Sequence, residues 1–318
     1  MNLALIGFGN VGRALARLLH ARRAQYPFQV TGIHTAHHGT ALSSAGLSPD
    51  PEFGDPAASI DQFLDASKAD AAVEITTLNP ATGEPAISHI RAAFARGMHV
   101  VTANKGPIAH AYAALREEAE RRGLKFRFEA TVMDGAPVFN MVRNNLPGVR
   151  VLGFSGVLNS TSKVIIETME RGGTLEEGLC AARKMGITEG DGSYDVDGWD
   201  SAAKTAALAN VLMDARTAPQ AVSTRGIGRL TPERVGELAR AGKTVRLVSR
   251  ARRNSQGVSL RVRAEVLDKT DPLAALAGTS NLLLLHTDHM GTIGTVSIAP
   301  TVEQTAYGVF IDLVDLLN

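Results

Sequence analysis

The chain has very little cysteine: Cys180 is the only one among its 318 residues. A single thiol excludes an internal disulfide and any zinc site that needs two or more cysteines. The capping box Thr174…Glu177 predicts a helix that contains Cys180, and we expect the thiol to be packed and inert there. This expectation argues against a thiol-dependent dehydrogenase, and a chain without disulfides fits the cytoplasm.

The chain also lacks an excess of charge. Lys and Arg number 33 against 32 Asp and Glu, which gives a net charge of +1. The basic residues are scattered, so neither a nucleic-acid partner nor a membrane partner is expected. No apolar run reaches the ~20 residues that span a bilayer, and no basic leader precedes the first apolar segment. We expect a cytoplasmic protein with a small-molecule partner.

What is present begins with an apolar run over residues 3–6, followed at once by a glycine turn and a helical pattern. In this context GxGxxG indicates a dinucleotide site, because its glycines permit the turn, the approach of the pyrophosphate and close helix packing. The alternative is a tight turn that binds nothing. The residues expected to contact the cofactor are Gly7, Phe8, Gly9, Asn10, Val11 and Gly12.

An acidic residue is missing where NAD would need one. The next predicted strand covers residues 28–33, and its end is where a carboxylate normally holds the ribose 2′-hydroxyl. No Asp or Glu precedes Asp50, whereas His34, His37 and His38 gather at this point. The cofactor is therefore expected to be NADP or NAD, with NADP favoured. No metal site is expected at these histidines, because no carboxylate lies beside them.

The rest of the first half alternates strands and helices. Residues 70–77 and 98–102 read as buried strands, with a helix over 85–96 between them. Lys105 follows the second strand, at the edge where open parallel sheets bind ligands. A helix is predicted from Pro107 to Gly123, and a strand over 124–131. This order predicts an α/β fold with an N-terminal Rossmann doubly wound parallel sheet.

The second half has a different pattern, with helices first and strands after. Strands are predicted over 149–158, 244–251, 258–267, 282–287 and 292–298, and helices over 161–170, 200–213 and 304–317. We predict a Rossmann domain over 1–133, onto which a C-terminal helix over 303–318 packs back. A second α+β domain is predicted over 134–302.

An acidic loop before the helix at 200–213 is the strongest candidate for a substrate pocket. Asp200 and Lys204 are four residues apart, so their side chains share one face of that helix. Glu189 and Asp195 lie upstream among three glycines, which allow tight turns. A cluster of carboxylates of this kind suits the binding of a small amine. The alternative is a solvated loop with an ordinary surface ion pair.

The motifs GFGNVG, VVTANKG, GVLNSTS and GWDSAAK occur in this order together with the acidic loop. The set resembles homoserine dehydrogenase, in the short form of the family without a C-terminal ACT domain. The resemblance implies reversible NAD(P)-dependent interconversion of L-homoserine and L-aspartate 4-semialdehyde, a step toward threonine and methionine. It also implies that the second domain binds substrate and that its sheet forms a homodimer interface.

The resemblance further implies roles for single residues. Lys204, Lys105 and Asp200 match the family's catalytic positions, and Glu189, Asp195 and Thr161 match its substrate-binding positions. Lys105, Thr76, Thr77 and Gly308 match positions near the cofactor, with no choice between the two threonines. A structural Na⁺ site is implied near Glu129 and Val132.

The sequence departs from the family at several of these places. Met133 and Asp134 replace a glycine-rich turn beside the implied Na⁺ site, so the sequence does not decide whether this site is present. Ser160, Ile187 and Gly190 replace the family's usual residues near the substrate. Two alternatives therefore remain: a related dehydrogenase of another amino or hydroxy acid, and a sensor that binds NADP without turnover.

Overall fold

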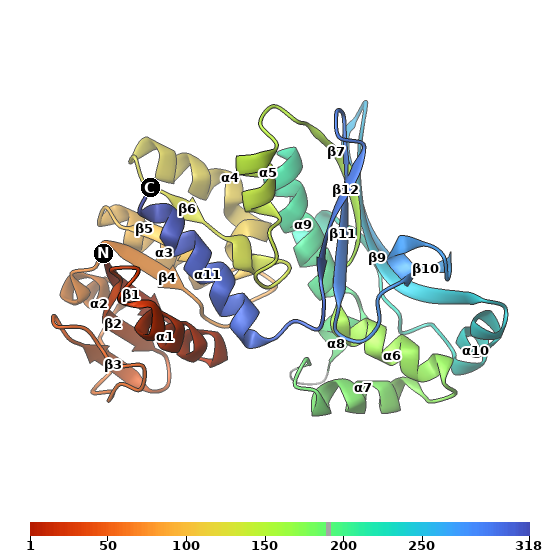
Figure 1. Ribbon diagram of the computed structural model, residues 1–318, viewed down its shortest axis with the longest axis horizontal. Coiled ribbons are helices and arrows are strands. Elements are labelled where there is room, and N and C mark those ends of the chain that lie inside the picture. Colours follow the sequence, from red (N-terminus) through yellow and green to blue (C-terminus); the bar gives the residue numbers. More distant parts are fainter. Residues whose placement is uncertain (189–191) are drawn as a thin grey trace. The chain divides into compact units, whose positions relative to one another are not determined.

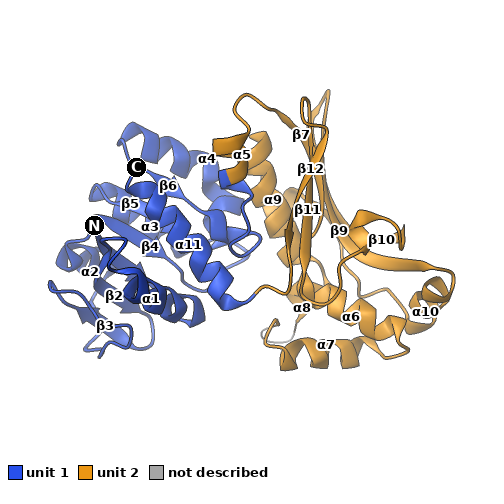
Figure 2. Cartoon of the chain, in the orientation of Figure 1, with its two compact units in different colours: residues 1–140, 301–318 blue, residues 141–300 orange. Residues whose placement is uncertain are grey.

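The computed structural model describes residues 1–188 and 192–318. Figure 2 shows its division into two compact units. Unit 1 comprises residues 1–140 and 301–318, and unit 2 comprises residues 141–300. Both ends of the chain therefore belong to the same unit.

Unit 1 is built on a six-stranded sheet with the order β3-β2-β1-β4-β5-β6. All described pairs are parallel except β2 with β3, which form an antiparallel hairpin at the edge. Because β1 lies between β2 and β4, the strand order reverses beside it, where open sheets bind ligands. The strands are β1 (Asn2–Ile6), β2 (Gln29–Thr35), β3 (Gly39–Leu42), β4 (Ala71–Glu74), β5 (His99–Thr102) and β6 (Phe126–Arg127).

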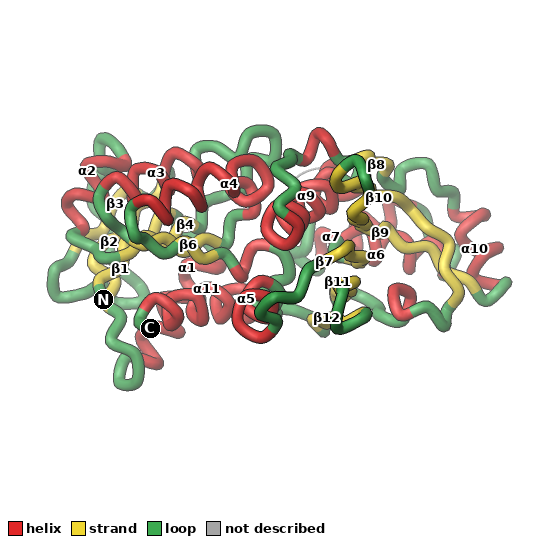
Figure 3. The backbone as a smooth tube through the Cα atoms, turned by 90° about the horizontal axis from the view of Figure 1, so that it is seen from above, coloured by secondary structure: helices red, strands yellow, loops and turns green. Residues whose placement is uncertain are grey.

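Helices cover both faces of this sheet, as Figure 3 shows. On one face α1 packs against α11, and Leu5, Leu15 and Leu313 share the core there with no exposed surface. Each such side chain stabilises the fold by about 1.5–3 kcal/mol. The opposite face carries α2, α3 and α4. The helices are α1 (Asn10–Arg22), α2 (Ile60–Ser67), α3 (Ala86–Ala95), α4 (Lys105–Arg121) and α11 (Val302–Leu316).

The structure differs from the sequence-based expectation at several places in unit 1. The strand predicted over 124–131 is only Phe126–Arg127, because the chain then turns into a 3-10 helix, η1 (Glu129–Thr131). Helix α4 begins at Lys105 rather than Pro107, because the Asn104 side chain accepts a hydrogen bond from Gly106 N and caps the helix earlier. Helix α2 and strand β3 were not predicted.

Unit 2 contains a second six-stranded sheet, with the order β12-β11-β7-β9-β10-β8. Its pairs are antiparallel except β10 with β8. Strands β9 and β10 form a long hairpin that turns at residues 254–257, as predicted, and both bend away at one end (Figure 1). The strands are β7 (Val151–Val157), β8 (Ser223–Arg225), β9 (Lys243–Asn254), β10 (Gly257–Asp268), β11 (Asn281–Thr287) and β12 (Thr292–Ser297).

Helix α9 packs on β7, β9 and β10, while α6 packs on α7. The close approach of α6 and α7 requires Gly178, because a Cβ there would lie 2.6 Å from Ile165 Cα. The predicted capping box of α7 is present. The helices are α5 (Phe139–Asn145), which crosses the boundary between the units, α6 (Ser160–Glu170), α7 (Leu175–Lys184), α8 (Ser193–Val196), α9 (Trp199–Met213) and α10 (Pro232–Arg240). Short 3-10 turns occur at η2 (Pro219–Ala221) and η3 (Pro272–Ala274).

The expectation for Cys180 was wrong in one respect. The residue lies within α7, as predicted, but its thiol is exposed and not packed. The buried residues of α7 are Gly178 and Ala182, so Cys180 lies on the outer side of this helix. In the part of the chain that the structure describes, no helix has the length and apolar character required to cross a membrane.

Candidate active site

The glycine turn after β1 has the geometry that a dinucleotide site requires. Gly7 has a φ of +100°, and a Cβ there would lie 2.7 Å from Ile75 O. A Cβ on Gly12 would lie 3.1 Å from Ile75 Cδ1, so this glycine lets α1 pack closely. A Cβ on Gly9 would meet nothing within 4 Å, which leaves open space at the N-terminus of α1. No described side chain caps α1, so its first amides suit a pyrophosphate.

The loops that follow β4 and β5 are joined by hydrogen bonds at the same edge of the sheet. Asn104 Nδ2 donates to Thr76 O at 3.2 Å, and Asn104 N donates to Thr102 Oγ1 at 2.9 Å. The Thr76 hydroxyl donates to the carboxylate of Glu74. Thr77 makes no such contact in the described structure. Lys105, the first residue of α4, is half-buried and lies directly after this junction.

Glu129 and Gly308 have packing partners within unit 1. Glu129 Oε1 accepts hydrogen bonds from Val138 N at 2.6 Å and Phe139 N at 2.9 Å, and Oε2 accepts one from Asn140 N. A Cβ on Gly308 would lie 2.9 Å from Gly135 Cα, so this glycine allows α11 to approach the 134–135 turn. The Glu129 carboxylate therefore fixes the start of α5.

Unit 2 brings a lysine and two carboxylates together. Lys204 Nζ lies 3.1 Å from Asp200 Oδ2 and donates to Leu158 O at 2.6 Å. The side chains of Lys204 and Asp200 are 17% and 18% exposed, so water screens this pair less than a surface ion pair. The predicted helical spacing of four residues places both groups on one face of α9.

Asn159 connects this pair to Asp195. Its Nδ2 donates to Asp195 Oδ1 at 2.6 Å and to Asp200 Oδ2 at 3.0 Å, while its Oδ1 accepts from Ser162 N and caps α6. Burial raises the pKa of Asp195 above its usual range, and the Asp200 carboxylate raises this pKa further. Hydrogen bonds from Asn159 and Thr161, together with Lys204, oppose the rise.

Thr161 lies at the start of α6 beside the same group. Its hydroxyl bonds to the Thr188 hydroxyl at 2.6 Å and donates to Ile187 O at 3.2 Å. The structure thus brings Thr161, Asp195, Asp200 and Lys204 into one cluster around Asn159. The remaining candidate of this group, Glu189, and the departure at Gly190 lie outside the described residues. Sequence reasoning missed Asn159 as a site residue, although its position just before a predicted helix is typical of a cap.

The comparisons with known proteins show the family of this chain. A family model described as homoserine dehydrogenase matches residues 137–314, and a model described as the homoserine dehydrogenase NAD binding domain matches residues 7–129. The chain belongs to the homoserine dehydrogenase family. The resemblance that the ordered motifs predicted is confirmed, as is the Rossmann fold of the N-terminal half. Residues 7–129 form the NAD(P)-binding domain of this family.

Individual homoserine dehydrogenases match over almost the whole chain. The NAD(+)-dependent homoserine dehydrogenase of Pseudomonas canavaninivorans is 32% identical over an alignment of 335 residues. The alignment covers 99% of this chain and 95% of that protein. The structure of a putative homoserine dehydrogenase from Archaeoglobus fulgidus superposes with a TM-score of 0.89 at 29% identity, covering 99% of both chains. A hyperthermophilic archaeal homoserine dehydrogenase in complex with NADPH has a TM-score of 0.84 at 26% identity, covering 99% of this chain and 97% of the other.

A second lysine in unit 2 of this homoserine dehydrogenase family member was not predicted. Lys163, on α6, is 1% exposed, and its Nζ donates to Ser280 O. Burial lowers the pKa of Lys163 to about 8, and the Arg246 and Lys204 charges act in the same direction, while Glu167 opposes them. No spacing or motif in the sequence marks this residue, because its burial results from the packing of α6 beside the 279–281 segment.

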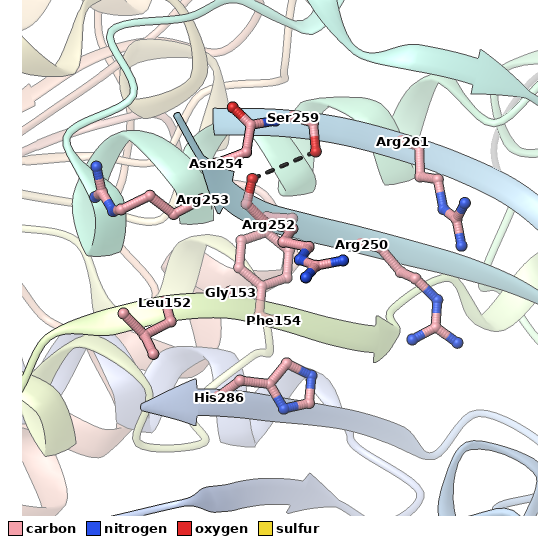
Figure 4. Close-up of a pocket in the computed structure, with 11 residues that line it drawn as sticks. Leu152, Gly153, Phe154, Arg250, Arg252, Arg253, Asn254, Ser259, Arg261 and His286 are labelled. Atoms are coloured by element: carbon pink, nitrogen blue, oxygen red, sulfur yellow. Dashed lines mark hydrogen bonds between the residues drawn. The ribbon is translucent and has the colours of Figure 1, made fainter. Parts of the chain in front are cut away.

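A separate cavity of about 810 Å³ lies on the sheet of unit 2 and contains none of the predicted site residues. In Figure 4 Arg250 and His286 extend to the same side of the sheet from β9 and β11. Arg250 pairs with Glu265 at 2.7 Å, so part of its charge is already neutralised. The chemistry of the Lys204 cluster, and not cavity size, therefore identifies the candidate active site. Within residues 1–188 and 192–318, no three His, Cys, Asp or Glu side chains are arranged to hold a metal ion.

Proposed function

We propose that this protein catalyses the reversible interconversion of L-homoserine and L-aspartate 4-semialdehyde with NAD(P). The observation that carries the proposal is the ammonium of Lys204, held between the Asp200 carboxylate and the Leu158 carbonyl in a member of this family. A cationic donor of this kind suits a reaction in which a carbonyl oxygen gains negative charge and then a proton.

The chemistry assigns Lys204 to the reacting oxygen. In the reductive direction Lys204 donates a proton to the oxygen of the aldehyde, and in the oxidative direction it takes the hydroxyl proton of homoserine. When bound, NAD(P)H supplies the hydride. Asp200 holds Lys204 at 3.1 Å and keeps the ammonium oriented. Lys105 is proposed as the catalytic lysine of unit 1, because it follows β5 at the ligand-binding edge of the sheet.

The amino-acid part of the substrate is assigned to the acidic side of the cluster. Asp195 and Glu189 are proposed to bind the substrate ammonium, since ionised pairs give stronger hydrogen bonds than neutral ones. Thr161 is proposed to bind the substrate carboxylate by donating its hydroxyl proton to it in place of Ile187 O. The departures at Ser160 and Ile187 change side chains close to Thr161, and the same cluster would also suit another small amino or hydroxy acid.

The cofactor is assigned to residues 7–12, Thr76, Thr77, Lys105 and Gly308. Of the two threonines, Thr77 is the better candidate for direct contact, because the Thr76 hydroxyl proton is donated to Glu74. NADP is proposed over NAD, since no acidic residue precedes Asp50 and the carboxylate that normally follows β2 to hold a ribose hydroxyl is therefore missing. A Na⁺ ion near Glu129 and Val132 would need carbonyl oxygens, because the Glu129 carboxylate already accepts three backbone N–H groups.

The protein is further proposed to act as a cytoplasmic homodimer. The support for a dimer is apolar exposure at strand β12 of unit 2, where Val296 is 47% exposed and Ile298, the residue after the strand, is 70% exposed. The cytoplasm is favoured by the single cysteine of the sequence.

An absorbance assay at 340 nm with purified protein tests the proposal. We expect reduction of NADP and of NAD with L-homoserine, and a higher kcat/KM for NADP. A panel of other amino and hydroxy acids serves as the control for substrate class. Turnover of another panel member with no turnover of homoserine would replace the proposed substrate. Tight dinucleotide binding without any turnover would indicate a sensor.

A further inference from the structure

Glu74 is a buried carboxylate that the proposed chemistry does not use. It ends β4 and is 0% exposed. Among the described residues its ion-pair partner is His89, whose Nδ1 lies 3.8 Å from Glu74 Oε1. This imidazole is charged only when it is protonated. No Lys or Arg within the described residues forms a salt bridge with it. Burying a carboxylate in this way costs free energy unless hydrogen bonds compensate for the lost water.

The compensating hydrogen bonds all come from the strand ends. Glu74 Oε1 accepts from Thr76 N at 3.1 Å and from the Thr76 hydroxyl, and Oε2 accepts from Thr102 Oγ1 at 3.1 Å. The Thr102 hydroxyl shares its one proton between this oxygen and Glu74 O, which lies 2.9 Å away. One carboxylate therefore connects the C-terminal ends of β4 and β5, which are adjacent in the sheet.

The connection continues into both loops. Thr102 Oγ1 accepts a hydrogen bond from Asn104 N, and Asn104 Nδ2 donates one to Thr76 O. These bonds close a ring around Glu74. Asn104 Oδ1 accepts from Gly106 N at 2.9 Å and starts α4 at Lys105. The position of the first turn of α4 is thus fixed relative to Thr76 in two ways, directly by Asn104 and through the two carboxylate oxygens of Glu74.

We propose that Glu74 is a positioning residue that holds the 75–77 and 103–106 loops in the geometry that receives the nicotinamide half of the cofactor. This inference rests on the proposed function, because it assumes that unit 1 binds NAD(P) at this edge. An ionised carboxylate suits the role because both of its oxygens accept hydrogen bonds and neither donates. An apolar residue of similar size would fill the space but remove the carboxylate links, so that the loops would keep only the bonds to Thr76 O and Glu74 O.

Two ligands separate positioning from general stability. NADPH or NADH, whichever the wild type binds more tightly, is compared with the matching ADP-ribose, which lacks the nicotinamide ring. ADP-ribose reports on residues 7–12 and the end of β2, which are proposed to bind the pyrophosphate and the adenosine ribose. In Glu74→Met we expect dinucleotide affinity to fall about tenfold, and ADP-ribose affinity to stay within about twofold. Calorimetry or fluorescence titration measures both.

Matched variants make the comparison specific. Glu74→Gln should restore most of the dinucleotide affinity, because its amide oxygen can accept from Thr76 while its NH₂ donates to the Thr102 hydroxyl. Thr102→Val removes the link from the other side and should reproduce the selective loss, even if Glu74→Met fails to fold. Thr31→Val, which deletes another buried hydroxyl in the same sheet, should leave both affinities unchanged.

The outcomes distinguish this inference from the proposed function. Equal loss of both ligands in Glu74→Met and Thr102→Val, or no loss of either, would overturn the positioning role while wild-type turnover leaves the proposed function intact. Wild-type protein that binds neither ligand would overturn the proposed cofactor site itself, and the inference with it.

Discussion

At the scale of single residues, Lys204 is the group on which the proposed chemistry depends most. We expect Lys204→Ala to lower kcat for homoserine oxidation by about 10²–10⁴-fold, the usual contribution of a positioned proton donor or acceptor. Dinucleotide affinity should stay near the wild-type value, because the proposed cofactor contacts lie in unit 1. Steady-state kinetics and a binding titration together provide the measurement.

Lys243→Ala is the matched control for this change. Lys243 begins β9, is 47% exposed and lies 3.8 Å from Asp268, so its removal deletes a lysine without touching the cluster. Its kcat should be unchanged. Wild-type turnover in Lys204→Ala would exclude this lysine from the reaction, and an equal fall in both variants would point to charge in general.

Lys163 gives a prediction about stability and pH. Its pKa is lowered from 10.5 to about 8, with burial as the main cause, so the folded protein releases this proton before the unfolded chain does. Between these two values the unfolded chain binds more protons, and the free energy of unfolding rises with pH by at most roughly 3 kcal/mol. Below the lower value both states hold the proton and this contribution to the slope disappears.

Urea unfolding at several pH values between about 7.5 and 10 would measure this rise, since the window follows from the lowered pKa. Lys163→Met should remove the Lys163 part of the slope, and the exposed Lys243→Met should keep it. Parallel slopes for wild type and Lys163→Met would show that burial of this ammonium does not set the pH dependence.

At the scale of elements, the N-terminus of α6 contributes both to the stability of this helix and to the candidate active site. Asn159 caps this helix and also donates to Asp195 and Asp200. Asn159→Ala should cost about 1 kcal/mol from the lost cap. The substitution also leaves two neighbouring carboxylates without their shared donor. We therefore expect kcat/KM for homoserine to fall by more than a loss of about 1 kcal/mol in the free energy of unfolding would cause.

Thr231→Ala is the control for the cap alone, because Thr231 caps α10 by accepting from Arg234 N. It should lose similar stability in thermal melting and retain full activity. If Asn159→Ala keeps wild-type kcat/KM while its melting temperature falls, the residue is a helix cap and nothing more.

Elements with strong local signals were predictable, and those set by distant contacts were not. The glycine turn, the capping box and the β9–β10 turn carry their information in neighbouring residues, and each occurs where the sequence predicted it. The strand predicted over 124–131 failed because Glu129, within that segment, accepts hydrogen bonds from the backbone amides of residues 138–140. Tertiary hydrogen bonds override strand propensity in such a segment.

The candidate site follows the same rule. Asp200 and Lys204 could be found because helical spacing alone brings them together. Lys163 and Glu74 could not, since Lys163 meets Ser280 and Glu74 meets Thr102 only through the folded packing of separate elements. The exposed thiol of Cys180 was missed for a related reason: composition favours a buried cysteine, but the face of α7 that packs on α6 is fixed by Gly178.

At the scale of the whole molecule, the proposed homodimer makes a prediction about mass. Val296 pairs with Leu282 in the β11–β12 ladder, so both side chains lie on one face of the sheet. Leu284, two residues further along β11, shares that face and is partly exposed. The exposed Val296 and Ile298, together with Leu284, form an apolar area at this end of the sheet, which suits an isologous contact with a second copy.

Sedimentation equilibrium should therefore give about 67 kDa, twice the chain mass of 33.6 kDa. The double variant Val296→Glu with Ile298→Glu should sediment as a monomer, because two copies would bury four carboxylates without partners, at a cost of several kcal/mol. Met185→Glu is the matched control: its side chain is 53% exposed, like Val296, but it lies at the end of α7 and away from the sheet. A dimer that survives the double change and dissociates with Met185→Glu would move the interface from the sheet to α7, and a monomeric wild type would exclude the dimer.

Because α9 packs on β7, β9 and β10 and carries Lys204, a monomeric variant that also loses turnover would indicate that the second copy stabilises the sheet beneath the cluster.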